Sequence, residues 1–442
     1  MVPGLRKFHT GHYLRFTMRG ARTNSIGPET ESVVGMFEDG IHIPTSTERL
    51  SPFFDVERID VLRGPQVTTF GQRAYAGAIS IPNNKPNFDG FSGWAELENG
   101  LPDKTRWRMA LNMPAGDTLS FRVAGISESR SGWIDNAYIE SDADDMNDRK
   151  VQVIRGSILW QPSDRFNMLI WTRYHDENGT GTAPWGYQQI GGYVDGELKP
   201  GNQFAGPGAS PDNGPWGVNR NFISNAAYEN WVNTLELNWD AGFADLKWLS
   251  NFTSFHGRQV YDNDYTDLGE PTSTPFAGFS TDRQRTWSSE LRLTSKNDGP
   301  LTWAAGLFYS NRRTEWGWVE AHRSEYTQPE WDVPGEYEVD STAAFGQMTY
   351  AWDNGFSVTG GLRWTEDEKT MKSGEEDSWD EVLWKAALQY DLSDRTMTWF
   401  SASTGFQPGG INTAPGVRPF WDKEKLTAYE LGLKTVMADG KV

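Results

Sequence analysis

Acidic and histidine side chains are the residues of this sequence that could bind a metal ion or carry a proton in catalysis. The chain of 442 residues has 60 Asp and Glu, six His and no Cys, which excludes disulfides and thiolate metal sites. His9 and His12 lie three residues apart, but no Glu accompanies them in the spacing of a zinc motif. A phosphate-binding glycine loop and a nucleophile elbow are also absent from the sequence. We therefore predict that the protein is not an enzyme and has no catalytic residue, metal site or cofactor.

Aromatic side chains are a second set that could bind a ligand. The chain has 21 Trp, 23 Phe and 15 Tyr, together 13% of its residues. Segment 177–226 mixes aromatic side chains with Gly, Asn and Pro, a composition that suits stacking on sugars or on flat chelates. It suits a loop that packs on itself equally well. Nucleic acid is excluded as a partner, because the formal net charge is −19 and phosphate binding needs a clustered basic surface.

The elements that must position these side chains are β-strands. Apolar and polar residues alternate with a period of two, which is typical of a strand with two different faces. No stretch reaches the 18 apolar residues of a membrane helix, and no long segment has a period of 3.6. The pattern predicts fourteen strands in an all-β fold, at 91–99, 105–113, 119–126, 151–160, 166–175, 231–239, 244–255, 287–295, 301–310, 341–352, 356–365, 384–390, 397–405 and 426–435.

The links between these strands alternate in length. Short links rich in Asp, Asn, Gly, Pro and Ser have ordinary turn chemistry, and they are Pro114–Asp117, Gln161–Asp164, Asp240–Phe243, Lys296–Pro300, Asp353–Gly355, Leu392–Arg395 and Ala438–Lys441. The links between them are mostly long, at 129–149, 177–226, 258–281, 315–340, 370–379 and 406–425, and Leu101–Asp103 is the one exception. Short turns at one rim and long loops at the other predict a large antiparallel transmembrane β-barrel.

Tryptophans at many strand ends support a membrane location. In a bilayer such side chains lie at the two interfaces, where an amphipathic ring is best solvated. The alternative is that they are core anchors of a soluble β-protein. The tryptophans concerned are Trp94, Trp107, Trp160, Trp171, Trp239, Trp248, Trp287, Trp303, Trp364 and Trp399. With the alternation of links, they predict outer-membrane lipid as a partner.

Residues 15–86 have a different texture, with short strand-like pieces broken by Gly and charged turns. They contain the pairs Arg19–Gly20 and Asp39–Gly40, the run VERIDVLRGPQ at 56–66, then FGQ at 70–72 and AGAIS at 76–80. This order of motifs resembles the second half of the plug domain of TonB-dependent outer-membrane receptors. GFQPGGIN at 405–412 and YELGLK at 429–434 are similar to motifs of the barrel in the same family.

The resemblance implies a division into a partial α+β plug at 1–88 and a partial barrel at 89–442. It assigns a structural role in the plug to Arg19, Gly20, Asp39, Gly40, Glu57, Arg63, Gly64, Pro65, Gly71 and Gly77. Glycines there permit turns in which a Cβ would clash. Arg63 and Glu57 are expected to pair with barrel residues that face inward.

Receptors of this family have plugged barrels of twenty-two strands, whereas about fourteen are expected here. The first residues also lack the apolar stretch of a signal peptide. We therefore expect a fragment that lacks the first half of the plug, the energy-coupling box and about eight final strands. Such a fragment could not support energised uptake as it stands.

The function implied by the resemblance is uptake of a scarce nutrient across the bacterial outer membrane. A ferric siderophore is the first expectation, with an oligosaccharide or cobalamin as alternatives, and the energy-transducing TonB complex of the inner membrane as partner of the full-length protein. The expected ligand contacts are Arg22, Asn24, Thr45, Glu48, Trp185, Tyr187 and Trp216. Two other classes stay open: a passive porin, and a secreted carbohydrate-binding β-protein.

Overall fold

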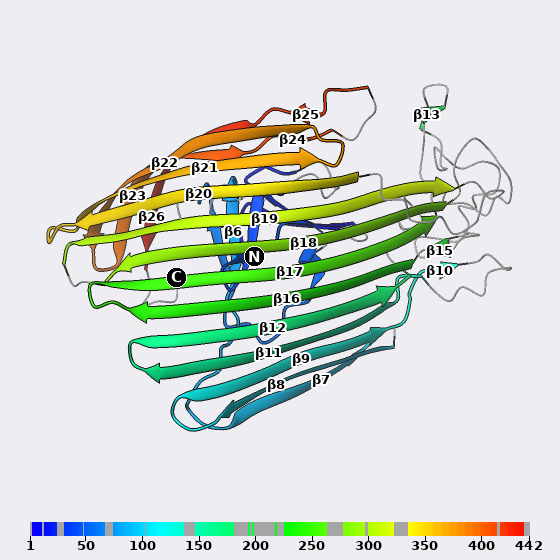
Figure 1. The fold of residues 1–442 in the computed structure, drawn as a ribbon, viewed down its shortest axis with the longest axis horizontal. Helices are drawn as coiled ribbons and strands as arrows, with labels where there is room; N and C mark the ends of the chain where they lie inside the picture. Colours follow the sequence, from blue (N-terminus) through cyan, green and yellow to red (C-terminus); the bar gives the residue numbers. More distant parts are fainter. Residues whose placement is uncertain are drawn as a thin grey trace.

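One large antiparallel sheet dominates the molecule, which is known from a computed structural model (Figure 1). The structure describes residues 2–10, 13–23, 31–46, 48–66, 74–101, 103–136, 146–180, 193–194, 197–198, 217–218, 225–262, 277–296, 299–321, 335–412 and 416–436. Among them, no helix has the length and apolar character needed to cross a membrane.

The large sheet has fourteen strands, each paired antiparallel with the next long strand of the chain, so that β7 and β26 form its two edges. The strands are β7 (Ser92–Gly100), β8 (Lys104–Pro114), β9 (Leu119–Arg130), β11 (Arg149–Ser163), β12 (Phe166–Gly179), β16 (Asn225–Asp240), β17 (Ala244–Asp262), β18 (Ala277–Ser295), β19 (Leu301–Ala321), β20 (Gly335–Ala351), β21 (Phe356–Met371), β22 (Glu376–Ser393), β23 (Thr396–Gln407) and β26 (Glu424–Thr435). All fourteen predicted strands are therefore confirmed.

The two faces of the sheet differ as the period of two requires. In β16 the even-numbered side chains from Ala226 to Glu236 are buried on the inner face, whereas Trp231 is 45% exposed on the outer face. Phe252, Leu307 and Leu362 are exposed in the same way on other strands. The outer face thus carries large exposed apolar side chains. The inner face buries polar side chains such as Asn230, Thr234 and Glu236 beside apolar ones such as Val232, which differs from the apolar interior of a soluble sandwich.

Three of the tryptophans expected at the membrane interfaces face inward instead. Trp171 is 2% exposed, and Trp399 lines an internal cavity. Trp94 is directly opposite Ala110, which is fully buried on the inner face, and direct cross-strand partners share a face. The sequence prediction was wrong here because a position at a strand end does not reveal to which face a side chain points.

Several strands extend beyond their predicted bounds at the rim of the long links. β18 begins at Ala277, ten residues before the predicted start, because residues such as Ser280, Thr281 and Gln284 are polar although they are buried. The predicted long link 370–379 is also wrong. β21 and β22 continue to a tight turn between Met371 and Glu376, where polar, mostly exposed residues give no apolar alternation. The predicted link Ala438–Lys441 lies outside the described residues.

The N-terminal segment, defined as residues 2–91, contacts the inner face of the large sheet (Figure 1). It contains the hairpin β1 (Leu5–Thr10) and β2 (Tyr13–Met18), a 3₁₀ turn at Glu48–Leu50, and a four-stranded sheet in the order β4-β3-β6-β5. The strands of this sheet are β3 (Val34–Glu38), β4 (Ile41–His42), β5 (Asp60–Arg63) and β6 (Gly77–Ile81), and β3 pairs parallel with β6. Met18, Val34, Met36, Ile79 and Ile81 form its core.

Short two-residue pairings complete the described structure. β10 (Asp135–Asn136) pairs with β15 (Gly217–Val218), and β13 (Tyr193–Val194) pairs with β14 (Glu197–Leu198). β24 (Gly410–Ile411) pairs with β25 (Phe420–Trp421) in the link between β23 and β26. All three pairs lie within links that the sequence predicts to be long.

Gly77, at the start of β6, is a glycine that the packing requires. A Cβ there would lie 2.2 Å from the sulfur of Met18 and 2.5 Å from the carbonyl oxygen of Leu62. The Met18 side chain could move, but the Leu62 carbonyl belongs to the neighbouring strand β5. The close packing of β2, β5 and β6 therefore depends on the missing side chain.

Gly77→Ala should lower the free energy of unfolding by about 1–3 kcal/mol, because the methyl group overpacks this site. Gly156→Ala in β11 is the matched control, since a Cβ there meets no atom within 4 Å. Thermal unfolding of both variants in detergent, followed by circular dichroism, measures the difference. Equal midpoints for the two variants would contradict the assigned packing.

Candidate functional site

Two tight turns shape the edge of the N-terminal segment. Arg19 and Gly20 have φ angles of 51° and 87°, and Asp39 and Gly40 have 50° and 88°. Positive φ at both central residues is the mark of a type I′ turn, which favours Asp-Gly and tolerates Arg-Gly only at a steric cost in the first position. The two sequence motifs Arg19–Gly20 and Asp39–Gly40 are thus turn residues. Arg19 itself, and Glu38 next to the second turn, form ion pairs with the large sheet.

Asp55 joins the N-terminal segment to two adjacent strands. Its side chain is fully buried and accepts hydrogen bonds from Arg122 of β9, at 2.8 and 2.5 Å, and from Arg155 of β11, at 2.9 Å. The guanidinium of Arg155 also lies 5.2 Å from the ring centre of Phe54. Two cations and one carboxylate in a dry contact hold this residue in one position, because a displaced charge would lose its partners.

Three further ion pairs connect the segment to other strands. Glu38 accepts a hydrogen bond from Arg173 of β12, and both side chains are less than a tenth exposed. Glu31 accepts one from Arg312 of β19 at 3.1 Å, and both are again buried. Lys85 is 2.9 Å from Glu236 of β16, which also contacts Lys247. The charged contacts therefore reach strands from β9 to β19.

The motif around Arg63 behaves differently from the expectation. Arg63 is exposed, and within the described ranges no ion pair forms between it and the large sheet. Glu57 pairs with its neighbour Arg58, at 2.5 Å, and not with a strand of the large sheet. Arg19 makes the contact to the sheet instead, at 2.7 Å from Glu430 of β26.

Gly64 and Pro65 lie beside this contact. Gly64 has φ +82°, and a Cβ there would lie 3.4 Å from the Arg19 guanidinium. Its backbone amide donates to the Ala76 carbonyl, which closes the turn after β5. Pro65 is buried, and Gly71 lies outside the described residues.

A cavity of about 290 Å³ separates this motif from the inner face of the sheet. Its lining is mainly polar and comes from the N-terminal segment on one side and strands β20 to β26 on the other: Arg63, Gly64, Pro65, Gln66, Gln347, Thr359, Lys385, Ala387, Gln389, Trp399, Ser401, Ser403, Ala428 and Glu430. The cavity has room for a few water molecules or a small polar solute beside the segment.

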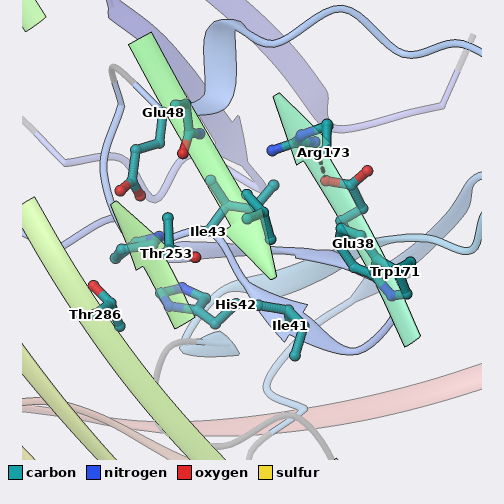
Figure 2. Close-up of a pocket in the computed structure, with 12 residues that line it drawn as sticks. Glu38, Ile41, His42, Ile43, Glu48, Trp171, Arg173, Thr253 and Thr286 are labelled. Carbon is teal, nitrogen blue, oxygen red and sulfur yellow. Dashed lines mark hydrogen bonds and ion pairs between the residues drawn. The ribbon is translucent and has the colours of Figure 1, made fainter. Parts of the chain in front are cut away.

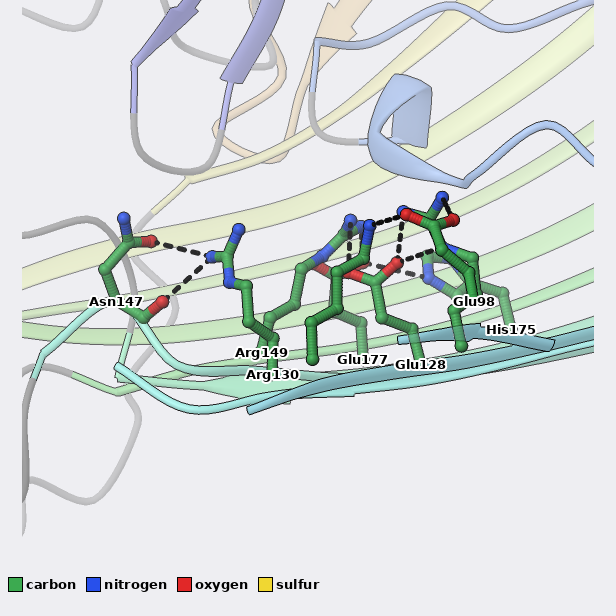
Figure 3. Close-up of polar contacts among 9 residues, drawn as sticks. Glu98, Glu128, Arg130, Asn147, Arg149, His175 and Glu177 are labelled. Atoms are coloured by element: carbon green, nitrogen blue, oxygen red, sulfur yellow. Dashed lines mark hydrogen bonds and ion pairs between the residues drawn. The ribbon is translucent and has the colours of Figure 1, made fainter. Parts of the chain in front are cut away.

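A ladder of charges crosses the inner face of five neighbouring strands (Figure 3). Arg106 of β8 bonds Glu98 of β7 at 2.9 Å and Glu128 of β9 at 2.6 Å. Arg149 of β11 bonds Glu177 of β12 at 2.7 and 2.8 Å, and it lies 3.8 Å from Glu128. The signs alternate from strand to strand, so the ladder stabilises one register of the sheet and rejects a shifted one.

The link between β23 and β26 packs back on the sheet. Phe420 contacts Trp379 with ring centres 6.0 Å apart, and both are buried together with Phe406 and Ile411. Gln407, the last residue of β23 before this link, donates to the Glu31 backbone carbonyl at 3.3 Å. This segment therefore touches the N-terminal segment at the same residue that pairs with Arg312.

A small cavity lies under the turn that carries Glu48 (Figure 2). Its volume is about 20 Å³, and it is lined by Glu38, Ile41, His42, Ile43, Pro44, Glu48, Trp171, Arg173, Asn230, Val232, Thr253 and Thr286. Burial and the nearby charge of Asp282 raise the pKa of Glu48 to about 7. Burial lowers the pKa of its neighbour Arg49 to about 10.

The expected ligand contacts fall into three groups. Arg22 is exposed, whereas Thr45 and Glu48 are each 3% exposed, and Glu48 lines the small cavity just described. A ligand could reach the latter two only after the covering groups move. Asn24, Trp185, Tyr187 and Trp216 lie outside the described residues. No cluster of three or more His, Asp or Glu suited to a metal occurs in the part of the chain that the structure describes.

Sequence reasoning missed the main charged contacts, which are those of Asp55, Arg122, Arg155 and Arg173. A signal for the arginines was present, because they occupy polar positions in strands whose apolar positions define the outer face. Their partners could not be deduced, since Arg155 and Asp55 are 100 residues apart.

Comparison with known proteins identifies the family of the sheet and of the N-terminal segment. Residues 160–442 match the model of the TonB-dependent receptor-like β-barrel, and residues 1–78 match that of the TonB-dependent receptor plug domain. The pesticin receptor of Yersinia pestis is 22% identical over 99% of this chain, and the chain spans 62% of that receptor's length.

Solved structures have the same fold. The ferric yersiniabactin uptake receptor FyuA from Yersinia pestis superposes with a TM-score of 0.79 at 19% identity, over 99% of this chain and 66% of that one. The ferric-catecholate import receptor Fiu from E. coli superposes with a TM-score of 0.72 at 15% identity, over 99% and 68% of the two chains.

Asp55→Asn should destabilise the protein by about 3–5 kcal/mol, because it leaves the buried Arg155 guanidinium without a full counter-charge. Asp60→Asn is the control: Asp60 pairs with Arg58 at 3.0 Å, but both side chains are over 40% exposed. That change should cost less than about 1 kcal/mol. Thermal unfolding in detergent compares the two, and losses of equal size would show that Asp55 does not anchor the segment.

Proposed function

The chain belongs to the TonB-dependent receptors, outer-membrane β-barrel proteins with a plug, and we propose that it serves the uptake of a ferric chelate of the siderophore class. The family consists of transport receptors, which are not enzymes. Its members bind siderophores and interact with TonB. The N-terminal segment is called the plug from here on.

The observation that carries the proposal is a plug anchored on the inner face of the sheet by buried charge. Asp55, Glu38 and Glu31 each pair with an arginine of a different strand or pair of strands. A passive porin needs no such plug, and a soluble carbohydrate-binding protein would not expose its apolar face. The relatives favour iron chelates as cargo, because their names refer to ferric yersiniabactin and to ferric catecholates.

We also propose the arrangement of the parts. The plug ends at residue 88 and the barrel begins at 89. Arg19, Gly20, Asp39, Gly40, Glu57, Arg63, Gly64, Pro65, Gly71 and Gly77 form its structural motif. In the full-length protein the TonB complex of the inner membrane supplies the energy that displaces the plug.

The proposed ligand contacts are Arg22, Asn24, Trp185, Tyr187 and Trp216, with Thr45 and Glu48 accessible only after a rearrangement. The aromatic members would stack on a flat chelate. The exposed guanidinium of Arg22 would attract an anionic one.

Titration of the purified protein in detergent with ferric siderophores should quench its tryptophan fluorescence with saturation. Hydroxamate, catecholate and phenolate chelates are tested in parallel, and the same chelators without iron serve as controls. Trp185→Ala and Tyr187→Ala should each weaken binding by about twofold to tenfold if the rings stack on the ligand, since a stacking contact contributes about 0.5–1.5 kcal/mol beyond its buried area.

Oligosaccharides and cyanocobalamin form two further arms of this experiment. Saturable binding of either one, with no response to any ferric chelate, would overturn the proposed siderophore cargo. It would leave the assignment as an uptake receptor intact. A large constitutive conductance in liposomes, with no ligand binding, would favour the passive porin instead.

A further inference from the structure

Glu48, which lines the small cavity of Figure 2, differs from the other buried carboxylates between plug and sheet because no arginine or lysine forms an ion pair with it among the described residues. Glu48 is 3% exposed, and neither of its oxygens accepts a hydrogen bond. The backbone amide of Thr45 approaches the carboxylate and favours its charge slightly, but the geometry falls short of a hydrogen bond. A buried carboxylate in this state is costly unless something neutralises it.

Two more buried oxygens line the same space. Asn230 Oδ1, in β16, and Thr286 Oγ1, in β18, have no hydrogen-bond partner, and both residues are less than a tenth exposed. The volume of about 20 Å³ has room for one atom-sized guest. Carboxylate, amide and hydroxyl oxygens are the ligands of a small hard cation, and one carboxylate suits a single positive charge.

The charged and titratable groups around Glu48 come from both the plug and the sheet. They are the carboxylates of Glu31, Glu38 and Asp282, the guanidinium groups of Arg49, Arg173 and Arg312, and the imidazole of His42, which lines the same cavity. Arg173 and Arg312 are bound to Glu38 and Glu31. Arg49 donates its bonds to the Ile43 carbonyl, at 3.2 and 3.1 Å, and not to Glu48.

We propose that this cavity is a binding site for one positive charge, a proton or a small monovalent cation such as Na⁺, which neutralises Glu48 while the plug is seated. The guest bridges the plug to β16 and β18 through Asn230 and Thr286. The free energy of seating the plug on the sheet then depends on pH and on the concentration of the cation. This inference concerns the seating of the plug and does not depend on which cargo the receptor carries.

The sign of the pH effect follows from the raised pKa. The pKa of Glu48 is about 7 with the plug seated, against 4.5 for an exposed glutamate. A proton therefore stabilises the seated plug: the stabilisation is fully present below about pH 4.5 and is lost as pH rises through 7. Na⁺ would act at high pH, where the proton has left.

The test is thermal unfolding of the purified full chain in detergent, between pH 5.5 and 8.5, with choline, Na⁺ or K⁺ chloride at constant ionic strength. The wild-type midpoint should fall as pH rises through 7 in choline. A saturable rise on replacing choline by Na⁺ or K⁺ at pH 8.5 would identify a metal cation as guest. A pH response without an ion response would identify the proton.

Glu48→Gln removes the charge and keeps the shape. It should lose both responses, and at pH 8.5 in choline its midpoint should exceed that of the wild type by about 2 °C or more. Glu57→Gln is the matched control on the same plug, since Glu57 is exposed, and it should keep the wild-type responses. The proposal is overturned if wild type and Glu48→Gln respond alike, if neither pH nor cation moves the wild-type midpoint, or if Glu48→Gln is the less stable at pH 8.5 in choline.

Discussion

The alternation of side chains along a strand is the constraint on which the rest of this structure depends. Because the period is two and the outer face must be apolar, every charge that a strand carries in its membrane section has to point inward. The sheet therefore presents rows of arginine and glutamate to its own interior. Such an interior requires a second element whose charges match, and apolar side chains of that element, Phe54 and Ile41, also complete two buried apolar clusters with the strands. The plug, with Glu31, Glu38 and Asp55 placed opposite arginines of the strands, is that element.

Buried ion pairs of this kind decide where the plug sits more than how tightly it sits. The cost of removing both charges from water offsets much of their attraction, so an intact pair contributes little net stability. A displaced pair is strongly destabilising, because each charge is then buried without its partner. Contacts on β9, β11, β12, β16, β19 and β26 together allow one orientation of the plug and penalise its neighbours. The ladder across β7 to β12 fixes the register of the wall in the same way.

The sequence predicted the strands of the wall because the apolar outer face repeats in every one of them. It failed where that face ends: the polar outer parts of β18, β21 and β22 have no apolar alternation, so they were assigned to loops. Within the plug, the turn residues Asp39 and Gly40 were predictable from local chemistry. The contacts of Asp55 were not, because they join residues 67 and 100 positions apart and depend on the depth and rotation of the plug inside the barrel.

Glu48 shows why a plug built on charge can be both specific and removable. The plug carboxylates of Glu31, Glu38 and Asp55 have buried arginine partners on the strands, so their contribution changes little with the medium. Glu48 accepts no hydrogen bond from an arginine, and in our proposal a guest from outside the chain neutralises it. A charged Glu48 would oppose the seating of the plug that the three pairs favour, whereas a neutral one would not. The balance between these terms places the free energy of seating under the control of a single small guest, without any change in the ion pairs that define the orientation.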